Sequence, residues 1–471
     1  MPKPSNESST LTIVAACLAT AMLMLDISVI NTALSEIASG LDTGLSGLQW
    51  LVDAYTIPLA ATVLTAGAIA DRLGRRRLFI LGLSIFTVSS ALCGAAGGIE
   101  VLVGSRAIQG LGASLMFATA LALISQATPD RESRVKALAA YGAAIGASFA
   151  LGPFIGGGLT ELFGWRAIFL VNVPIGAIVL WITYRSVAES RDPTPRRIDL
   201  PGQITLIGGL FLLVLALLRG NEEGWGSAGI VAALAGAVAL LVAFVVVEQR
   251  SREPMLPLRL LRERQFAGAQ VAVFAIAASF FAVFLYLTLY LQTVLGMSPI
   301  ETGLVYLPGT FLVFVVSGMT AQMGANSSPA KIATIGLGLV AAGLALMLIA
   351  GVESSWTALL PGLLVTSVGT GLFNPTGSAL ALNALPAEQS GLAAGANDTY
   401  RQTRVAVGIA ALGTLVPADA ALGGDLQSYV DGLHHARIAS AALAAAGAIA
   451  TGWLLLGVRR PAEAEPLTET A

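Results

Sequence analysis

Between two long apolar runs, the chain reads Gly67-Ala-Ile-Ala-Asp71-Arg72-Leu-Gly74-Arg75-Arg76-Arg77. Glycine at position 74 permits a tight turn between two helices, because glycine adopts backbone conformations that other residues avoid. The arginines suit a loop on the cytoplasmic side of a membrane, where Lys and Arg accumulate. A generic basic turn does not explain the acidic residue, which can accept bonds from a helix N-terminus or an arginine. We therefore predict a functional segment, with Gly67, Asp71, Arg72, Gly74, Arg75 and Arg76 as its site residues.

The composition places most of the surface in lipid. Of the 471 residues, 55% are hydrophobic and only 11% are charged, whereas soluble chains carry about 25% charged residues. The polar side chains are too few to cover a water-facing surface. A net charge of −2 gives no reason to expect a nucleic-acid partner. Both cysteines, Cys17 and Cys93, lie in apolar runs, and there are two histidines, so we expect neither a disulfide framework nor a metal site.

A membrane helix needs roughly 20 mostly apolar residues, and the backbone of each such run must satisfy its own hydrogen bonds in lipid. The sequence therefore predicts an all-α polytopic membrane protein with fourteen transmembrane helices. They are expected at residues 12–34, 47–70, 78–97, 101–126, 136–159, 165–185, 201–218, 228–248, 266–292, 300–323, 331–350, 356–382, 391–415 and 437–457.

The Lys and Arg residues predict the orientation of these helices. With both termini in the cytoplasm, the basic residues gather on the inner side. Only Arg166, Arg219 and Arg437 then fall outside, and Arg106 falls within a helix. Reversing the chain, or losing one helix early, would scatter this bias. The N-terminal run has no clear cleavage site and is expected to be an uncleaved first helix.

Two polar, basic loops divide the chain. Residues 186–200 and 249–265 flank one helix pair, leaving six helices before it and six after it. Weak self-similarity between the halves supports two related bundles, as is usual in secondary transporters. We therefore predict a 6+2+6 organisation. It consists of a six-helix bundle (1–190), an inserted two-helix hairpin with flanking loops (191–262), and a second six-helix bundle with a short tail (263–471).

The basic segment at residues 67–77 resembles the signature of the major facilitator superfamily, which implies a gating role, and we call it the gating segment. Other stretches resemble its fourteen-helix drug:proton antiporter family, and the resemblance covers nearly the whole chain. They are Leu25-Asp26-Ile-Ser-Val-Ile-Asn31-Thr-Ala-Leu34, Trp50-Leu-Val-Asp53-Ala-Tyr55, Arg106-Ala-Ile-Gln109-Gly110-Leu-Gly112-Ala113, Gly152-Pro153-Phe-Ile-Gly156-Gly157 and Gly164-Trp165-Arg166-Ala-Ile-Phe169-Leu-Val-Asn172-Val-Pro174. One departure is Arg404, a bulky charge where this family often has a small residue near the end of helix 13.

Three ionisable residues fall inside predicted helices. Asp26 is roughly 20 Å along the first helix, in the outer half of the bilayer. Asp53 and Arg106 fall in the same layer. Because buried ionisable groups are costly and mark function, we predict that Asp26, Asp53 and Arg106 couple proton movement to transport. The alternative is a purely structural ion pair between helices.

The fifth helix is rich in glycine and carries a proline, so it can pack closely on a partner helix, expected from the second bundle. The resemblance implies that this seam controls leak, while ordinary small-residue packing is the alternative. The predicted residues are Gly146, Gly152, Pro153, Gly156 and Gly157.

A broad apolar pocket with a few polar anchors would suit small amphipathic compounds. Each candidate for it is equally compatible with packing. The candidates are Asn31, Tyr55, Gln109, Tyr286, Tyr290 and Asn374, with Gln292, Tyr306 and Asn383 also considered. Glu161, Glu301, Glu353, His434 and His435 are expected to be solvated.

The resemblance implies a proton-motive-force-driven antiporter that exports drugs or other small amphipathic compounds by alternating access. It would act as a monomer in the inner membrane of a bacterium, with protons, substrate and lipid as partners and no cofactor. A dedicated exporter of one secondary metabolite, antibiotic or lipid is the alternative. An enzyme is disfavoured because no nucleophile motif or catalytic domain is found. An ATP-driven pump lacks its phosphate loop, and a channel would need a ring of pore residues.

Overall fold

The structure is a computed structural model that describes residues 6–128, 130–191, 199–251, 254, 258, 263–323, 328–382, 407–417, 420 and 424–455. Across these ranges the chain forms helices joined by turns, which confirms the all-α class. The departure at Arg404 and the candidate Asn383 lie outside these ranges.

The first six expected helices form a larger number of segments. They are α1 (Asn6–Val29), the 3₁₀ turn η1 (Ile30–Ala33), α2 (Leu34–Leu41), α3 (Leu45–Leu73), α4 (Arg75–Gly94), α5 (Ile99–Ala127), α6 (Arg131–Phe163), α7 (Ala167–Leu170) and α8 (Asn172–Ser186). The inserted pair follows as α9 (Leu200–Glu223) and α10 (Ala228–Arg250).

The remaining segments include one that departs from regular α geometry. The run expected at 266–292 is α11 (Arg264–Ile276), the π segment η3 (Ala277–Phe281), α12 (Ala282–Leu289) and the π segment η4 (Tyr290–Val294). Then come α13 (Pro299–Gln322), α14 (Pro329–Leu346), η5 (Met347–Ile349), η6 (Trp356–Ala358), α15 (Leu360–Leu382), a helical stretch at 407–413, and α17 (Leu426–Leu455).

Local sequence signals explain where these helices begin and end. α3 ends at Gly74, whose φ of 118° suits glycine, and α4 starts at the next residue. Asp130 caps α6 by accepting a bond from the Ser133 backbone N–H at 2.8 Å. At the start of α13, Ser298 and Glu301 form a capping box. Turn chemistry written in the sequence therefore separates the apolar runs.

Eleven helices among the described residues are long and apolar enough to cross a membrane, or twelve when the two parts of α3, bent by 54°, count as one span. The run expected at 356–382 forms α15 but is not among them. Most of the run expected at 391–415 lies outside the described ranges. The total of fourteen helices therefore stays a prediction.

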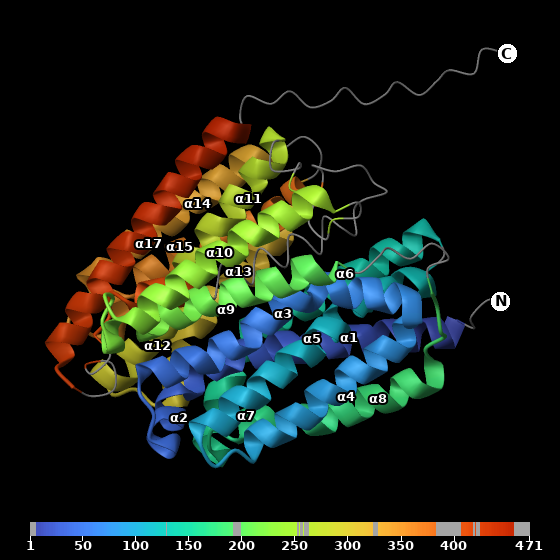
Figure 1. Ribbon diagram of the computed structural model, residues 1–471, viewed down its shortest axis with the longest axis horizontal. Helices are drawn as coiled ribbons and strands as arrows, with labels where there is room; N and C mark the ends of the chain where they lie inside the picture. Colours follow the sequence, from blue (N-terminus) through green and yellow to red (C-terminus); the bar gives the residue numbers. More distant parts are fainter. Residues whose placement is uncertain are drawn as a thin grey trace.

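The helices before and after the inserted pair pack mainly among themselves. α5 packs on α3 and α4, and α1 packs on α5, α6 and α8; later in the chain, α14 packs on α15 and α17, and α13 packs on α15. We call these sets the N-terminal and C-terminal groups. Figure 1 shows the first in blue to teal and the second in yellow to red, with α9 and α10 drawn across the front. α6 and α13 join the groups, and α9 rests on α3.

Candidate functional site

Asp26 on α1 and Arg106 on α5 meet in the centre of the N-terminal group, where each side chain is 1% exposed. Nη1 of Arg106 donates to Oδ2 of Asp26 at 2.5 Å and to Oε1 of Gln109 at 2.8 Å. Nε donates to the Leu51 carbonyl at 3.3 Å. The close packing of α1 on α5 thus produces a buried ion pair between two of the three predicted coupling residues.

Side-chain amides complete the shell of this pair. Oδ1 of Asp26 accepts from Nδ2 of Asn172 at 2.8 Å and from Nε2 of Gln109 at 3.0 Å. Both amides also donate to Oγ of Ser90, at 3.3 and 2.7 Å. We call Asp26, Ser90, Arg106, Gln109 and Asn172 the aspartate–arginine cluster. Both carboxylate oxygens of Asp26 are therefore matched by donors.

Sequence reasoning placed Gln109 among the cavity residues and missed the roles of Ser90 and Asn172. Each of the two missed residues is a polar side chain inside an apolar run, which is the signal that could have identified it. Tyr55, another cavity candidate, lies against Arg106, whose Cζ is 4.1 Å from the ring centroid. Gln109 and Tyr55 thus hold the buried charge in place.

Asp53 on α3 is fully buried, but it makes no hydrogen bond to Arg106 or Asp26. Neither of its carboxylate oxygens has a hydrogen-bond partner. One turn earlier, Nε2 of Gln49 donates to the hydroxyl of Tyr286 at 2.7 Å, across to the C-terminal group. Residues four apart share a helix face. The expected grouping of both carboxylates around one arginine is therefore wrong, because Asp53 faces the other group.

The gating segment is organised by two carboxylates. Oδ1 of Asp71 accepts from Nε and Nη2 of Arg75, at 2.9 and 2.8 Å. Glu189, after α8, accepts from the backbone N–H groups of Arg76 and Arg77 at 3.1 and 3.2 Å, which caps α4. The predicted role of Asp71 toward an arginine has a geometric basis, whereas the capping of α4 falls to Glu189, which sequence reasoning missed.

Two glycines of this segment differ in how closely they are packed. A Cβ at Gly74 would meet the Glu189 carboxylate at 2.6 Å, and the φ of this residue is positive. A Cβ at Gly67 would meet Ala118 at 4.0 Å, an ordinary contact. Of the arginines in this segment, Arg76 donates from Nη2 to the Tyr184 carbonyl at 2.7 Å, and Arg72 also has a polar or electrostatic partner.

The predicted glycine face of the fifth helix, α6, packs against two partners. A Cβ at Gly152 or Gly156 would run into α1 and η1, at Ser28 and at Val29 and Thr32. This part of the expectation is wrong, because those two glycines face their own group.

The other glycines meet the C-terminal group as expected. A Cβ at Gly157 would lie 2.3 Å from the Pro299 carbonyl oxygen of α13, and one at Gly146 would lie 3.1 Å from the Phe314 ring. On the facing side, a Cβ at Gly303 would lie 2.4 Å from the carbonyl oxygen of Pro153. The backbones of α6 and α13 therefore touch directly.

The two groups meet at one end of this seam. Oε2 of Glu161, on α6, accepts from Oγ of Ser298 at 2.7 Å and from the Ile300 backbone N–H at 3.1 Å. Nε2 of Gln292 donates to the Thr32 carbonyl at 2.7 Å. Glu161 is exposed, as expected, and it also accepts hydrogen bonds at the N-terminus of α13, a contact that the sequence did not predict.

Toward the other end of the seam, the groups are apart. A Cβ added at Gly142 on α6 or at Gly318 on α13 would meet nothing within 4 Å. Most side chains between Lys136 and Ala144 on α6 are exposed. The conformation is thus closed at the end that carries Gly157 and Pro299 and open at the end that carries Gly142 and Gly318.

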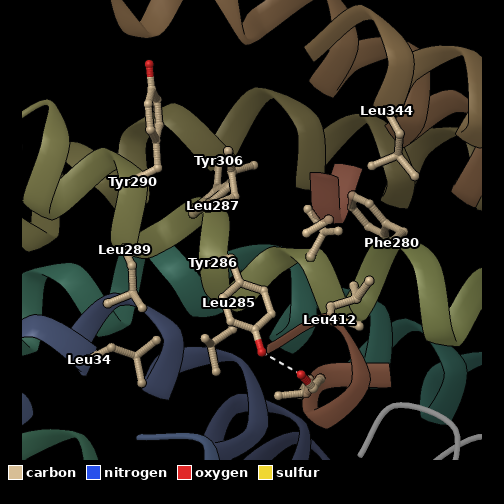
Figure 2. Packing of buried hydrophobic residues seen from close by; sticks show 14 of the residues in the cluster. Leu34, Phe280, Leu285, Tyr286, Leu287, Leu289, Tyr290, Tyr306, Leu344 and Leu412 are labelled. Atoms are coloured by element: carbon tan, nitrogen blue, oxygen red, sulfur yellow. Dashed lines mark hydrogen bonds between the residues drawn. The ribbon is translucent and has the colours of Figure 1, made fainter. Parts of the chain in front are cut away.

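The tyrosine candidates Tyr286 and Tyr290 are fully buried rather than facing an open pocket. Their hydroxyls donate to the Ile409 carbonyl at 2.5 Å and to the Gly351 carbonyl at 2.7 Å. Figure 2 shows the two side chains pointing in opposite directions, with the Tyr286 bond dashed. Helix geometry changes from α to π at Tyr290.

Two amide candidates lie elsewhere. Asn31 is half-buried and donates to the Ser28 carbonyl at 3.4 Å, within its own helix. Asn374 on α15 is exposed. Neither contacts the aspartate–arginine cluster through a hydrogen bond found in the structure.

Arg437 on α17 departs most from expectation. It was assigned to the outer surface, yet it is 0% exposed. Nη1 donates to the Met347 carbonyl at 2.8 Å, at the end of α14. Nε and Nη2 have no partner, and none of the ion pairs among the described residues includes Arg437. Helix packing buries it, which a count of loop charges could not foresee.

Three tyrosines lie in the neighbourhood of this arginine. Its Cζ lies 5.4 Å from the ring centroid of Tyr290, and Tyr306 and Tyr429 lie within electrostatic range of the guanidinium. We call Arg437, Tyr290, Tyr306 and Tyr429 the arginine–tyrosine cluster. Nearby, one of the two histidines expected to be solvated, His434, makes a 2.8 Å bond to the Ala350 carbonyl, while His435 is exposed.

Two helix groups closed at one end and open at the other, with buried charges in each, define a multi-pass membrane transporter rather than an enzyme. Residues 16–410 match the model of the Major Facilitator Superfamily. The chain belongs to this superfamily.

Several relatives carry resistance names. The Multidrug resistance protein Stp of Mycobacterium tuberculosis is 36% identical over 416 residues, covering 88% of this chain and 77% of the relative. The Methylenomycin A resistance protein of Streptomyces coelicolor is 32% identical, covering 84% of this chain and 83% of the relative. The Tetracenomycin C resistance and export protein of Streptomyces glaucescens is 33% identical, covering 86% and 75%.

Solved structures support the fold. A bacterial homologue of the human drug peptide transporters has a TM-score of 0.62 at 15% identity, covering 95% of this chain and 98% of that one. The human organic anion transporter MFSD10 also has a TM-score of 0.62, at 16% identity, covering 96% and 100%. At these identities, the likeness concerns the fold alone.

Proposed function

We propose that this protein is an antiporter that exports drugs or other small amphipathic compounds, driven by the proton-motive force, through alternating access of a site between the two helix groups. Resistance and export names among its relatives support the exported class. The seam between α6 and α13, closed at one end and open at the other, supports alternating access.

The observation that carries proton coupling is the isolation of Asp53. An ionised carboxylate with no partner costs much free energy to bury, whereas the neutral acid costs far less. Closing the two helix groups around Asp53 therefore favours the form that carries a proton, and water entering from one side favours its release. Asp26 differs, because Arg106 and two amides stabilise its charge. We assign proton binding first to Asp53 and a coupling role to the Asp26–Arg106 pair.

The proposed topology is fourteen helices in a 6+2+6 arrangement, with both termini in the cytoplasm of a bacterial cell and the chain in its inner membrane. Its parts are residues 1–190, 191–262 and 263–471. The open end of the seam then faces the cytoplasm, where substrate is loaded. Protons, the exported compound and lipid are its partners, and the monomer is the working unit.

Everted membrane vesicles test the coupling. They are acidified inside by respiration, and the pH gradient is followed with a fluorescent weak base while ethidium is added. Wild-type protein should partly collapse the gradient on addition of ethidium. Asp53→Asn should abolish this response, and Asp53→Glu, which keeps the titratable group, should restore part of it. If Asp53→Asn released protons on addition of ethidium to the same extent as wild type, the proposed mechanism would be contradicted.

A dedicated exporter is a second candidate, since some relatives are named for a single compound, such as methylenomycin A or tetracenomycin C. A growth-inhibition panel of cationic dyes and neutral antibiotics, in a host lacking its own pumps, separates the two. Protection against several unrelated compounds supports a multidrug exporter, whereas protection against one supports the dedicated exporter. An uncoupler should raise dye accumulation in either case.

A further inference from the structure

Arg437 is an arginine without a matching charge in the interior of the C-terminal group. It is among the largest fully buried side chains of the described residues. Arginine keeps its charge at physiological pH, and a buried charge is stable only when it is paired. The Met347 carbonyl and the negative end of α14 stabilise one side of the guanidinium, at Nη1. They leave most of its hydrogen-bonding capacity unused.

The two unpartnered atoms, Nε and Nη2, belong to one edge of the planar guanidinium. This edge presents two parallel N–H groups, which is the geometry that grips a carboxylate through both of its oxygens. Nη1 is already bonded to the Met347 carbonyl, whereas the Nε–Nη2 edge is vacant. The partner that fits this vacant edge accepts two hydrogen bonds and carries a negative charge.

A second unpartnered group lies on the same helix. Ser440 is one turn along α17 from Arg437, is 0% exposed, and its hydroxyl has no hydrogen-bond partner. Residues three apart share a helix face. One face of α17 therefore carries three buried hydrogen-bonding atoms without partners, Nε, Nη2 and Oγ, on two adjacent turns.

The tyrosines add apolar surface rather than competing donors. The Tyr290 hydroxyl donates to the Gly351 carbonyl, and the Tyr429 hydroxyl donates to the Tyr286 carbonyl at 2.6 Å. The Tyr306 hydroxyl lies 3.0 Å from Oγ1 of Thr288, and its ring stacks on Phe284 with centroids 4.2 Å apart. With their hydroxyls engaged elsewhere, these residues offer rings to a ligand.

We propose that Arg437 and Ser440 form a binding site for a single anionic group, such as the carboxylate of an amphipathic compound or a free halide, whose apolar part rests against the surrounding tyrosine rings. The assignment of this site to the path of the exported substrate rests on the proposed export function. The site is enclosed in the conformation described here, so a ligand enters when the seam opens. Binding itself needs no proton gradient.

Equilibrium binding to the purified full-length protein in lipid nanodiscs tests the site. The probes are fluorescein and rhodamine 6G, which share a xanthene skeleton but carry opposite charge, and binding is read as fluorescence anisotropy. Arg437→Gln should weaken fluorescein binding at least tenfold and change rhodamine 6G binding less than twofold. The control is Arg219→Gln, since Arg219 is half-exposed and pairs with Glu223; it should leave both affinities unchanged.

Chloride distinguishes the two sources of the anion. Added at constant ionic strength against sulfate, chloride that competes with fluorescein in wild type but has no effect on Arg437→Gln shows that a free halide occupies the site. Fluorescein binding that depends on Arg437 but is insensitive to chloride shows that the organic acid is the occupant. Equal fluorescein affinity and equal chloride response in wild type and Arg437→Gln would overturn the proposal, as would wild-type protein that binds neither anion.

Loss of Arg437 can also impair folding, so two milder variants accompany it. Arg437→Lys keeps the charge but not the two-pronged edge, and Ser440→Ala removes only a hydroxyl. Each should weaken fluorescein binding at least threefold while the protein elutes as wild type in size exclusion. Wild-type affinity in both would contradict the site. Dye binding in nanodiscs and proton release in vesicles are separate measurements. If the export mechanism is wrong, the binding data still test the anion site.

Discussion

The aspartate–arginine cluster and the arginine–tyrosine cluster differ in how completely the buried arginine is paired. Arg106 has the carboxylate of Asp26 at 2.5 Å and the amide oxygen of Gln109 at 2.8 Å, and the amides of Gln109 and Asn172 both donate to that carboxylate. Arg437 has one backbone carbonyl and three tyrosine rings. The first arrangement is complete within the chain, whereas the second leaves one edge of the guanidinium free.

The difference distinguishes buried charges that stabilise the packing from buried charges that can bind a proton or a ligand. A charge whose partners all lie in the same helix group is a fixed part of the packing. A charge with unpartnered atoms, such as Asp53 or Arg437, has capacity left to bind something that arrives and leaves, a proton in one case and an anion in the other. Sequence alone treats Asp26, Asp53 and Arg106 as equivalent intramembrane charges and assigns Arg437 to the outer side.

The largest expected effect is loss of stability on removing the counter-charge of Arg106. Asp26→Asn leaves a buried guanidinium without its carboxylate, which should cost about 3–5 kcal/mol. Asp53→Asn removes no hydrogen bond and should cost less than about 1 kcal/mol. Thermal unfolding in detergent checks this, with the buried Cys93 thiol reporting exposure to a thiol-reactive dye. Equal melting temperatures for Asp26→Asn and Asp53→Asn would contradict the distinction between paired and unpaired buried charges.

A smaller effect is expected at the seam that joins the two groups. Gly157→Val places methyl groups where a Cβ alone would lie 2.3 Å from the Pro299 carbonyl oxygen, and overpacking of this kind costs about 1–3 kcal/mol. The closed end should therefore open more often. Disulfide trapping between cysteines introduced on α6 and α13 should become slower at that end. The matched control, Gly142→Val, meets open space, and equal trapping rates in both variants would contradict the close approach.

The next effect concerns the bond that ties Asp53's surroundings to the C-terminal group. Tyr286→Phe removes the hydroxyl that accepts from Gln49 and donates to Ile409, each bond being worth about 0.5–1.5 kcal/mol. It should weaken closure of the seam. Tyr306→Phe removes a hydroxyl that bonds within the C-terminal group. It should lower the melting temperature without changing disulfide trapping. Identical behaviour of the two variants would show that the Gln49–Tyr286 bond plays no part in closure.

The smallest effect is a pH-dependent helix cap, outside both clusters. Hydrogen bonds from Ser133 hold the pKa of the Asp130 carboxyl below its ordinary value of 3.8. A lowered pKa in the folded protein means that the cap stabilises α6 above the unfolded-state pKa, and that this contribution is lost as the pH falls through the folded-state value. Melting curves between pH 3 and 6 (roughly the range around the ordinary carboxyl pKa) should fall more steeply for wild type than for Asp130→Asn, which still caps.

Much of the architecture was predictable from short-range features. Apolar runs bounded by Gly74, Asp130 and Ser298 predicted helices close to those found, because helix caps and turns depend on neighbouring residues. The interruption of the 266–294 helix by π segments was not predictable. The apolar pattern continues through both π segments without a local break.

The candidate site was predictable in part. The sequence identifies Asp26 and Arg106 because a charge in an apolar run stands out, but it does not say which charges meet. Asp53 lies at a similar depth along its helix yet faces the C-terminal group, since rotation about the helix axis is set by the packing of α3 on α5 and α9. Ser90 and Asn172 gain their importance only through the amide network around Asp26.

By itself, the sequence determined that this chain is a helical membrane protein with charged residues inside its spans, because lipid admits few other backbones and makes every buried charge costly. Only the tertiary structure decided which of those charges are matched. It joined Asp26 to Arg106, left Asp53 buried without a hydrogen-bond partner, and placed Arg437 in the interior rather than at the expected surface. The physical reason is that pairing depends on helix rotation and crossing, which contacts distant in the chain set together.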